Sequence, residues 1–238
     1  MAPLLAVDEV TRRFGGVVAL DAVTFEVRPG EIVGLIGPNG AGKTTVFNVI
    51  TRIYKPDSGD VVFDGGSLLR TKPHRVLSRG IARTFQNLAL FPTMSVLDNV
   101  RVGQHGRSGG RDPLELLDYV GLANLAHRPA SGLPFGTLKR VEVARALASG
   151  PRLLLLDEPA AGLSHEEVEY LGQFLRRLRT DFDVTLLLVE HHMNLVMGIS
   201  DRVYVLDFGR VIAEGTPHEV QRDPAVIEAY LGSVDAAA

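Results

Sequence analysis

The chain has 238 residues, a formal net charge of −3 and no cysteine. This charge balance does not favour a generic binder of nucleic acid or anionic membranes, and the lack of cysteine excludes disulfides, zinc–thiolate sites and iron–sulfur ligation. Apolar runs such as Leu153–Leu156 are far shorter than the roughly 20 residues that span a bilayer, and the N-terminus lacks the pattern of a secretory signal. We therefore expect any membrane role to depend on a partner.

The first part of the chain predicts strands that lead into a phosphate-binding loop. Polar turns at residues 14–16 and 28–30 separate apolar segments, and Glu31–Ile36 has the composition of a buried strand. The next residues, Gly37-Pro-Asn-Gly-Ala-Gly-Lys-Thr44, fit the pattern G-x-x-x-x-G-K-[ST] at every fixed position. Residues 44–50 then predict a helix. A chance glycine-rich turn is the weaker interpretation, because the strand before the loop and the helix after it are both expected.

The chemistry of this loop predicts nucleoside triphosphate binding. Backbone N–H groups at the loop turn toward phosphate oxygens, and the glycines remove side chains that would block the approach. Lys43 reaches the β- and γ-phosphates, and the Thr44 hydroxyl ligates Mg²⁺. The predicted nucleotide-binding residues of this segment are Gly37, Pro38, Asn39, Gly40, Ala41, Gly42, Lys43, Thr44 and Thr45.

The middle of the chain changes from strand to helix signals. Two turns, at 57–60 and 64–66, bracket Val61–Phe63 and predict a short hairpin strand. From about residue 88 to 150 the strand signals end, and Pro113–Val120 and Leu138–Ala148 have helical spacing. The glycine-rich tract Gly103–Gly110 is typical of a surface loop.

Beyond Pro151 the alternation of strands and helices resumes. Strands are expected at 153–156, 185–189 and 203–206, with helices at 166–179 and about 225–231. Continuous apolar strands between helices predict an α/β fold with a mostly parallel sheet that is covered on both faces. We expect one domain, residues 1–238, with a core of 1–87 and 151–238 and an inserted helical subdomain of about 88–150.

A second acidic element is needed to hold Mg²⁺, and the end of the strand at 153–156 supplies it. An unpaired charge on Asp157 would be costly at the end of this apolar strand, so a metal partner is the natural explanation for the residue. Glu158, the next residue, is positioned to deprotonate a water that attacks the γ-phosphate. The alternative is a pair of solvated acids before a turn. Gln86 is a candidate for Mg²⁺ or the attacking water, and His191, after another strand, for the γ-phosphate. Because adjacent strand residues point to opposite faces, His192 is not expected to share a metal with His191.

With these elements in order, the chain resembles ATP-binding subunits of ABC transporters over nearly its whole length. Leu133-Pro-Phe-Gly-Thr137 occupies the place of the family's signature motif, ahead of a helix. The resemblance implies a P-loop ATPase core with an N-terminal antiparallel β part, in which Leu133, Phe135 and Gly136 bind the ATP held by the opposite subunit of a dimer. It also implies that Phe14 stacks on adenine, with a core aromatic as the alternative, that Gln86 marks the loop contacting the transporter, and that His191 is the switch histidine.

A narrower resemblance is to the ATPases of bacterial branched-chain amino-acid importers. It rests on Arg83-Thr-Phe-Gln-Asn-Leu88, Leu90-Phe-Pro92, Leu133–Gly136 and the ending Gly215-Thr-Pro…Ala229-Tyr-Leu-Gly232. Three residues depart from the usual pattern. Pro134 stands in place of Ser, although the narrower group also tends to show Pro there. Thr137 stands in place of Gln, and Ser164 in place of Asp or Asn. The tract 103–113 is also shorter than the equivalent insertion in the ATPases of branched-chain amino-acid importers.

The resemblance implies an ATP-hydrolysing motor subunit of an importer, with ATP and Mg²⁺ as cofactors. It acts as a homo- or heterodimer of ATPases, bound peripherally on the cytoplasmic face of the membrane to permease subunits and, through them, to a substrate-binding protein. The permease would dock on 87–100; packing of that segment into the helical insertion is the alternative. Other functions left open are a lipid or lipopolysaccharide exporter motor and a soluble ABC ATPase. A GTPase is disfavoured because no N-K-x-D motif is present.

Overall fold

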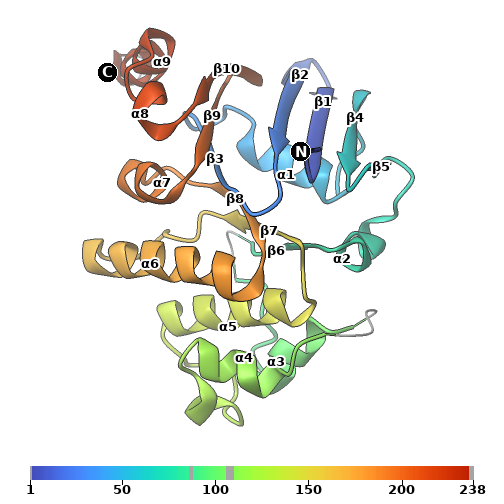
Figure 1. Cartoon of the computed structure of the whole chain (residues 1–238), viewed down its shortest axis with the longest axis vertical. Coiled ribbons are helices and arrows are strands. Elements are labelled where there is room, and N and C mark those ends of the chain that lie inside the picture. Colours follow the sequence, from blue (N-terminus) through green and yellow to red (C-terminus); the bar gives the residue numbers. More distant parts are fainter. Residues whose placement is uncertain (1, 86–87, 106–109, 236–238) are drawn as a thin grey trace.

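The computed structural model describes residues 2–85, 88–105 and 110–235, with side chains up to residue 230. A six-stranded sheet runs through the middle of the molecule in the order β10-β9-β3-β8-β7-β6 (Figure 1). The strands are β3 (Ile32–Ile36), β6 (Ile81–Arg83), β7 (Leu153–Asp157), β8 (Thr185–Val189), β9 (Arg202–Asp207) and β10 (Arg210–Gly215). All neighbours pair in parallel except β9 and β10. The prediction of a mostly parallel sheet is confirmed.

A second, antiparallel sheet lies beside the first and contains the N-terminus. It has the order β2-β1-β4-β5, with β1 (Leu5–Phe14), β2 (Val17–Val27), β4 (Ser58–Phe63) and β5 (Gly66–Ser67). The predicted turn after Phe14 joins β1 to β2, and the predicted hairpin joins β4 to β5. The expected antiparallel β part is therefore present.

Helices cover the other face of the large sheet. In Figure 1, α6 (His165–Phe182), α7 (Met193–Ile199), α8 (Pro217–Val220) and α9 (Pro224–Asp235) lie on the side opposite the antiparallel sheet. Strand residues alternate between two apolar cores: Leu154, Leu156, Leu186 and Leu188 belong to the core that α6 and α7 share, whereas Leu153, Leu155 and Leu187 belong to the core shared with the antiparallel sheet and α1 (Lys43–Ile50). Burial on both faces is why these strands read as continuous apolar runs.

A group of helices extends from one end of the sheet. It contains α3 (Val96–Val102), α4 (Pro113–Tyr119) and α5 (Phe135–Ala148), which pack on one another (Figure 1). Shorter helical turns are η1 (Pro73–Arg75), α2 (Val76–Arg79) and η2 (Ala123–Leu125). Within the described part of the chain, no helix is both long and apolar enough to cross a bilayer.

Candidate functional site

The phosphate-binding loop connects β3 to α1, as the sequence predicts. Lys43, the first residue of α1, is 8% exposed and donates hydrogen bonds from Nζ to the carbonyl oxygens of Gly37 at 2.7 Å and Pro38 at 2.9 Å. Asn39, Gly40 and Thr44 are exposed. The loop thus holds its lysine against its own backbone while the Thr44 side of α1 stays open, and the α1 dipole directs partial positive charge to the same place.

Two of the loop glycines are required by close packing. A Cβ at Gly37 would lie 1.9 Å from the carbonyl oxygen of Leu206, and one at Gly42, where φ is +106°, would lie 2.6 Å from that of Ala19. Gly40 differs, because a Cβ there would meet nothing within 4 Å. At Gly40 the backbone therefore faces open space in which a phosphate can approach.

Asp157 and Glu158 stand at the carboxyl end of β7, next to the loop. Burial lowers the pKa of Lys43, and the charges of Glu158 and Asp157 act to raise it. Glu158 adopts a left-handed conformation with φ of +47° and donates its backbone N–H to Val189 of β8 at 2.9 Å. A non-glycine residue held in this region is costly and is a frequent feature of functional sites. The structure therefore brings Lys43, Asp157 and Glu158 together.

The donor set fits a magnesium ion. Asp157 is 2% exposed, and its Oδ1 atom is buried with no hydrogen-bond partner among the described residues. Such an oxygen is costly unless a cation satisfies it. The exposed hydroxyl-bearing Thr44 and the carboxylate of Asp157 are hard oxygen ligands of the kind that Mg²⁺ prefers.

Arg83 is a site residue that the sequence analysis missed. From the last position of β6 it donates from Nη2 to Asp157 Oδ2 at 2.6 Å, and the two side chains are 6% and 2% exposed. Its Nη1 atom donates to Asn48 Oδ1 at 2.7 Å. In the sequence, Arg83 is recognisable only as part of a family motif, because nothing local predicts that β6 and β7 are neighbours.

His191 lies near the predicted general base. Its Nδ1 atom is 3.8 Å from Glu158 Oε2, and its side chain is 54% exposed. The expectation that His191 and His192 point to opposite faces is wrong, because their rings lie 5.1 Å apart. Strand β8 ends at Val189, so the alternation of strand side chains does not extend to this turn.

Glu190, also missed, braces this turn. It is fully buried; its Oε1 atom accepts from the backbone of Ala160 at 2.6 Å, and Oε2 accepts from those of His191 at 3.0 Å and His192 at 3.2 Å. One carboxylate thus connects the segment after Glu158 to the histidine turn.

Gln86 lies outside the described residues, but its surroundings are defined. Glu142 of α5 accepts a hydrogen bond from the backbone of Phe85 at 3.3 Å, and Arg145, one turn later, donates to the carbonyl oxygen of Ala89 at 2.5 Å. Helix α5 therefore contacts the chain on both sides of Gln86. In the proposed docking segment, Phe91 is 47% exposed, whereas Leu90 packs against the core.

The segment in the place of the signature motif begins α5. Leu133 is half-buried, Phe135 is 46% exposed, and Pro134 is the N-cap. A Cβ at Gly162 would lie 3.5 Å from the Phe135 ring, and one at Gly136 would lie 4.0 Å from Glu167. The segment thus faces the residues after Glu158, while Figure 1 shows α5 in the lower part of the molecule and α1 in the upper part.

Ser164, one of the three departures, has a local structural role. Its Oγ atom accepts from the backbone of Glu167 at 3.4 Å, and the Glu167 carboxylate accepts from the backbone of Ser164 at 2.7 Å. This capping box starts α6 and satisfies two N-terminal donors.

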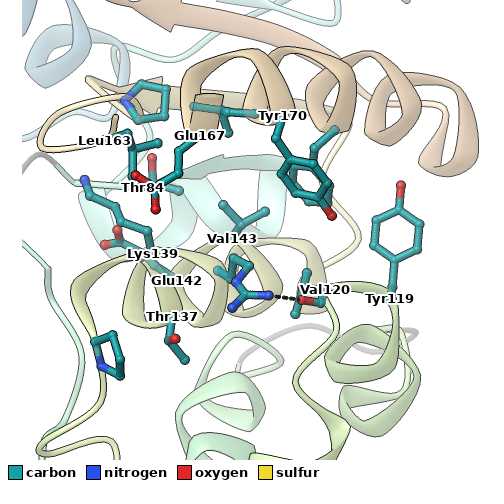
Figure 2. A pocket seen from close by; sticks show the side chains of 16 residues that line it. Thr84, Tyr119, Val120, Thr137, Lys139, Glu142, Val143, Leu163, Glu167 and Tyr170 are labelled. Atoms are coloured by element: carbon teal, nitrogen blue, oxygen red, sulfur yellow. Dashed lines mark hydrogen bonds between the residues drawn. The ribbon is translucent and has the colours of Figure 1, made fainter. Parts of the chain in front are cut away.

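A cavity of about 350 Å³ separates α5 from α6. Figure 2 shows Thr84, Lys139, Glu142 and Glu167 around one end of it and Tyr119 and Tyr170 around the other. Glu142 is 1% exposed, and its Oε2 atom has no hydrogen-bond partner among the described residues, so burial raises its pKa. Glu142 is therefore a buried carboxylate that lines this cavity between α5 and α6.

Phe14 is on the surface and not in the core. It is 39% exposed, its ring is 5.1 Å from that of Tyr54, and the Arg12 guanidinium lies 4.6 Å from it. Part of the Phe14 side chain is therefore accessible from solvent, beside the Arg12 guanidinium.

Tyr230 of α9, near the other end of the chain, lies close to the phosphate-binding loop. Burial raises the pKa of Tyr230 to about 12, and a hydrogen bond with the backbone of Gly37 acts in the opposite direction. Helix α9 therefore reaches the phosphate-binding loop.

Comparison with known proteins gives full-length relatives. The family model described as ABC transporter matches residues 20–161, and a model described as branched-chain amino acid ATP-binding cassette transporter matches 210–236. The chain is 44% identical to the high-affinity branched-chain amino acid transport ATP-binding protein LivG of Salmonella typhimurium, over 97% of this chain and 98% of that protein. It is 40% identical to BraF of Pseudomonas aeruginosa, with the same coverage.

Solved structures that are similar to this chain are also ATP-binding cassettes. An ATP-binding cassette of an ABC transporter in its ADP conformation matches with a TM-score of 0.88 and 31% identity, over 98% of this chain and all of that one. The expected P-loop ATPase fold is confirmed. The chain belongs to the ABC transporter family of ATP-binding proteins.

Proposed function

We propose that the protein is the ATP-hydrolysing motor subunit of a branched-chain amino-acid importer. The observation that carries this proposal is the convergence of Lys43, Asp157 and Glu158 at the ends of β3 and β7. Identity of 43–44% to LivG proteins over nearly the whole chain supports the substrate class. The match of residues 210–236 to a branched-chain model adds to this support.

The roles of the residues follow from their positions. Backbone groups of 37–45 and the Lys43 ammonium bind the phosphates, and Phe14 stacks on adenine. Thr44, Asp157 and Gln86 would hold Mg²⁺, which supplies positive charge at the β- and γ-phosphates. Glu158 accepts the proton of the attacking water, and His191 orients the γ-phosphate from the next strand end.

The partners follow from the same proposal. Helix α5, which begins at Phe135, lies apart from α1 (Figure 1), which supports the use of Leu133, Phe135 and Gly136 by the ATP of a second subunit. The dimer binds peripherally to the cytoplasmic face of membrane permeases, which receive the substrate from a binding protein. The chain is one ABC ATP-binding domain, with a core of 1–87 and 151–238 and a helical subdomain of about 88–150.

The test is substrate-stimulated turnover. The protein is reconstituted in proteoliposomes with the permease subunits that co-purify with it, and ATP hydrolysis is measured with binding protein plus leucine. We expect leucine to raise the rate and Lys43→Ala to abolish it. Stimulation by lipid instead would favour an exporter motor. A soluble partner with no permease would contradict transport altogether.

A further inference from the structure

Arg83 connects two elements that carry different halves of the predicted metal site. Its Nη2 atom donates to Asp157 Oδ2 at 2.6 Å, and its Nη1 atom donates to Asn48 Oδ1 at 2.7 Å. Asp157 is the last residue of β7, and Asn48 lies in α1, whose first turn carries Thr44. The planar guanidinium therefore spans from the metal-binding carboxylate to the phosphate-loop helix.

The environment of the guanidinium holds it in place. The ring centroids of Phe47 and Phe85 lie 5.4 Å and 5.0 Å from the Arg83 guanidinium carbon. The side chain is 6% exposed, so the pair with Asp157 is shielded from water. A buried charge-assisted pair with fixed geometry is strongly directional, unlike a surface ion pair.

Only one oxygen of Asp157 is used by this contact. Arg83 holds Oδ2, and Oδ1 has no hydrogen-bond partner among the described residues. Partners that engage one atom of a metal ligand fix the direction of the other, and their removal costs about 10- to 100-fold in metal affinity or activity.

We propose that Arg83 is a positioning residue that sets the distance between Asp157 and the Thr44 end of α1, so that Mg²⁺ can bind both. This rests on the proposed function, since it assumes that the site binds nucleotide with a metal.

The test measures metal-dependent nucleotide binding without turnover. A fluorescent ATP analogue is titrated with Mn²⁺ and, separately, with EDTA, for the wild type, Arg83→Met, Asp157→Asn and the double variant. We expect Arg83→Met to reduce the Mn²⁺-dependent gain in affinity about tenfold and to leave the EDTA affinity within about twofold. The double variant should lose no more than Asp157→Asn alone, because Arg83 acts through Asp157.

Two further variants keep the result interpretable. Arg152→Met removes another arginine–aspartate pair, with Asp64, near the opposite end of β7 and should bind Mn²⁺ and nucleotide as the wild type does. Arg83→Lys keeps the charge but cannot reach both partners with a planar fork, so a several-fold loss is expected even if Arg83→Met does not fold.

The outcomes separate this inference from the proposed function. Wild-type Mn²⁺-dependent affinity in Arg83→Met or Arg83→Lys, or additive losses in the double variant, would overturn the role of Arg83. If Lys43→Ala binds the analogue normally in EDTA, the nucleotide site itself is wrong, whatever Arg83 does. If Lys43→Ala loses binding while both Arg83 variants resemble the wild type, only the positioning role fails.

Discussion

The Oε1 atom of Glu190 accepts a hydrogen bond from the backbone N–H of Ala160 at 2.6 Å, and both residues are fully buried. Ala160 follows the Asp157-Glu158 pair, and Glu190 precedes the histidine turn. Since the second Glu190 oxygen accepts from His191 and His192, this carboxylate fixes the relative position of the two segments that flank the predicted γ-phosphate site.

We expect Glu190→Gln to destabilise the protein by about 1–3 kcal/mol, because the amide NH₂ group cannot accept and leaves a buried backbone donor unpaired. ATP turnover should fall with it, since the amide can no longer accept hydrogen bonds from both Ala160 and the histidine turn at once. Urea unfolding and ATPase rates measure the two effects. Glu169→Gln is the matched control, because Glu169 is 68% exposed and pairs with His165 on the helix surface. Equal stability of Glu190→Gln and the wild type would contradict a bracing role.

Glu158→Gln should retain ATP binding and lose turnover by about 10²–10⁴, because the amide keeps the shape of the side chain but cannot accept a proton from water. Dimers should accumulate with bound ATP, which size-exclusion chromatography detects. The exposed Glu166 provides the control variant Glu166→Gln. Near-normal turnover of Glu158→Gln would remove Glu158 as the base.

Much of the fold and half of the site could be predicted from local patterns. The phosphate-binding loop is a contiguous motif, and its neighbours β3 and α1 have clear apolar periodicity. Asp157 and Glu158 were found because a charged pair directly follows a continuous apolar strand. Ser164 departs from a family pattern, but Ser164-His-Glu-Glu167 is also a capping-box sequence, which local residue types are enough to predict.

The remaining site contacts depend on which strands are neighbours in the sheet, and the sequence does not show this strand order. Strand β6 has three residues, too few for a periodicity, so the pairing of Arg83 with Asp157 across β6 and β7 could not be anticipated. Glu190 was missed for the same reason, because its partner Ala160 follows β7, 30 residues away in the chain. Short strands and buried long-range pairs are the parts that local patterns leave undetermined.

Glu142 makes stability depend on pH. Burial raises its folded-state pKa above the ordinary value of 4.5, so the folded state binds more protons than the unfolded state, and stability is lost as the pH rises from 4.5 through the folded-state pKa. Glu142→Gln removes this loss. We expect it to be more stable than the wild type at pH 7, with the difference shrinking toward pH 4.

Denaturant unfolding at several pH values measures this difference. Glu115→Gln, at an exposed position of α4, is the control and should follow the wild-type profile. The stability of Glu142→Gln relative to the wild type could instead be lower at pH 7 than at pH 4. That result would show that the contacts of Glu142 with Phe85 and Arg145 stabilise the protein by more than burial of the charge costs.

Gly136 tests whether the site is shared between subunits. The nearest atom to an added Cβ at Gly136 is Glu167 Oε1 at 4.0 Å, which is ordinary contact, so Gly136→Ala should fold and, as a monomer, bind ATP like the wild type. If the α5 N-terminus closes on the phosphate of a second subunit, the added methyl group blocks that approach, and turnover should fall about tenfold or more.

Mixing the two impaired variants, Lys43→Ala and Gly136→Ala, then tests whether one ATP site is built from two subunits. Lys43→Ala lacks a working phosphate loop but has a normal α5 N-terminus, whereas Gly136→Ala has the reverse defect. A mixed dimer contains one intact pairing of Lys43 from one subunit with Gly136 from the other, so ATPase activity should reappear on mixing. Each variant mixed with the wild type is the control for subunit exchange. If exchange occurs and the mixture of the two variants stays inactive, each subunit completes its own site and the shared arrangement is wrong.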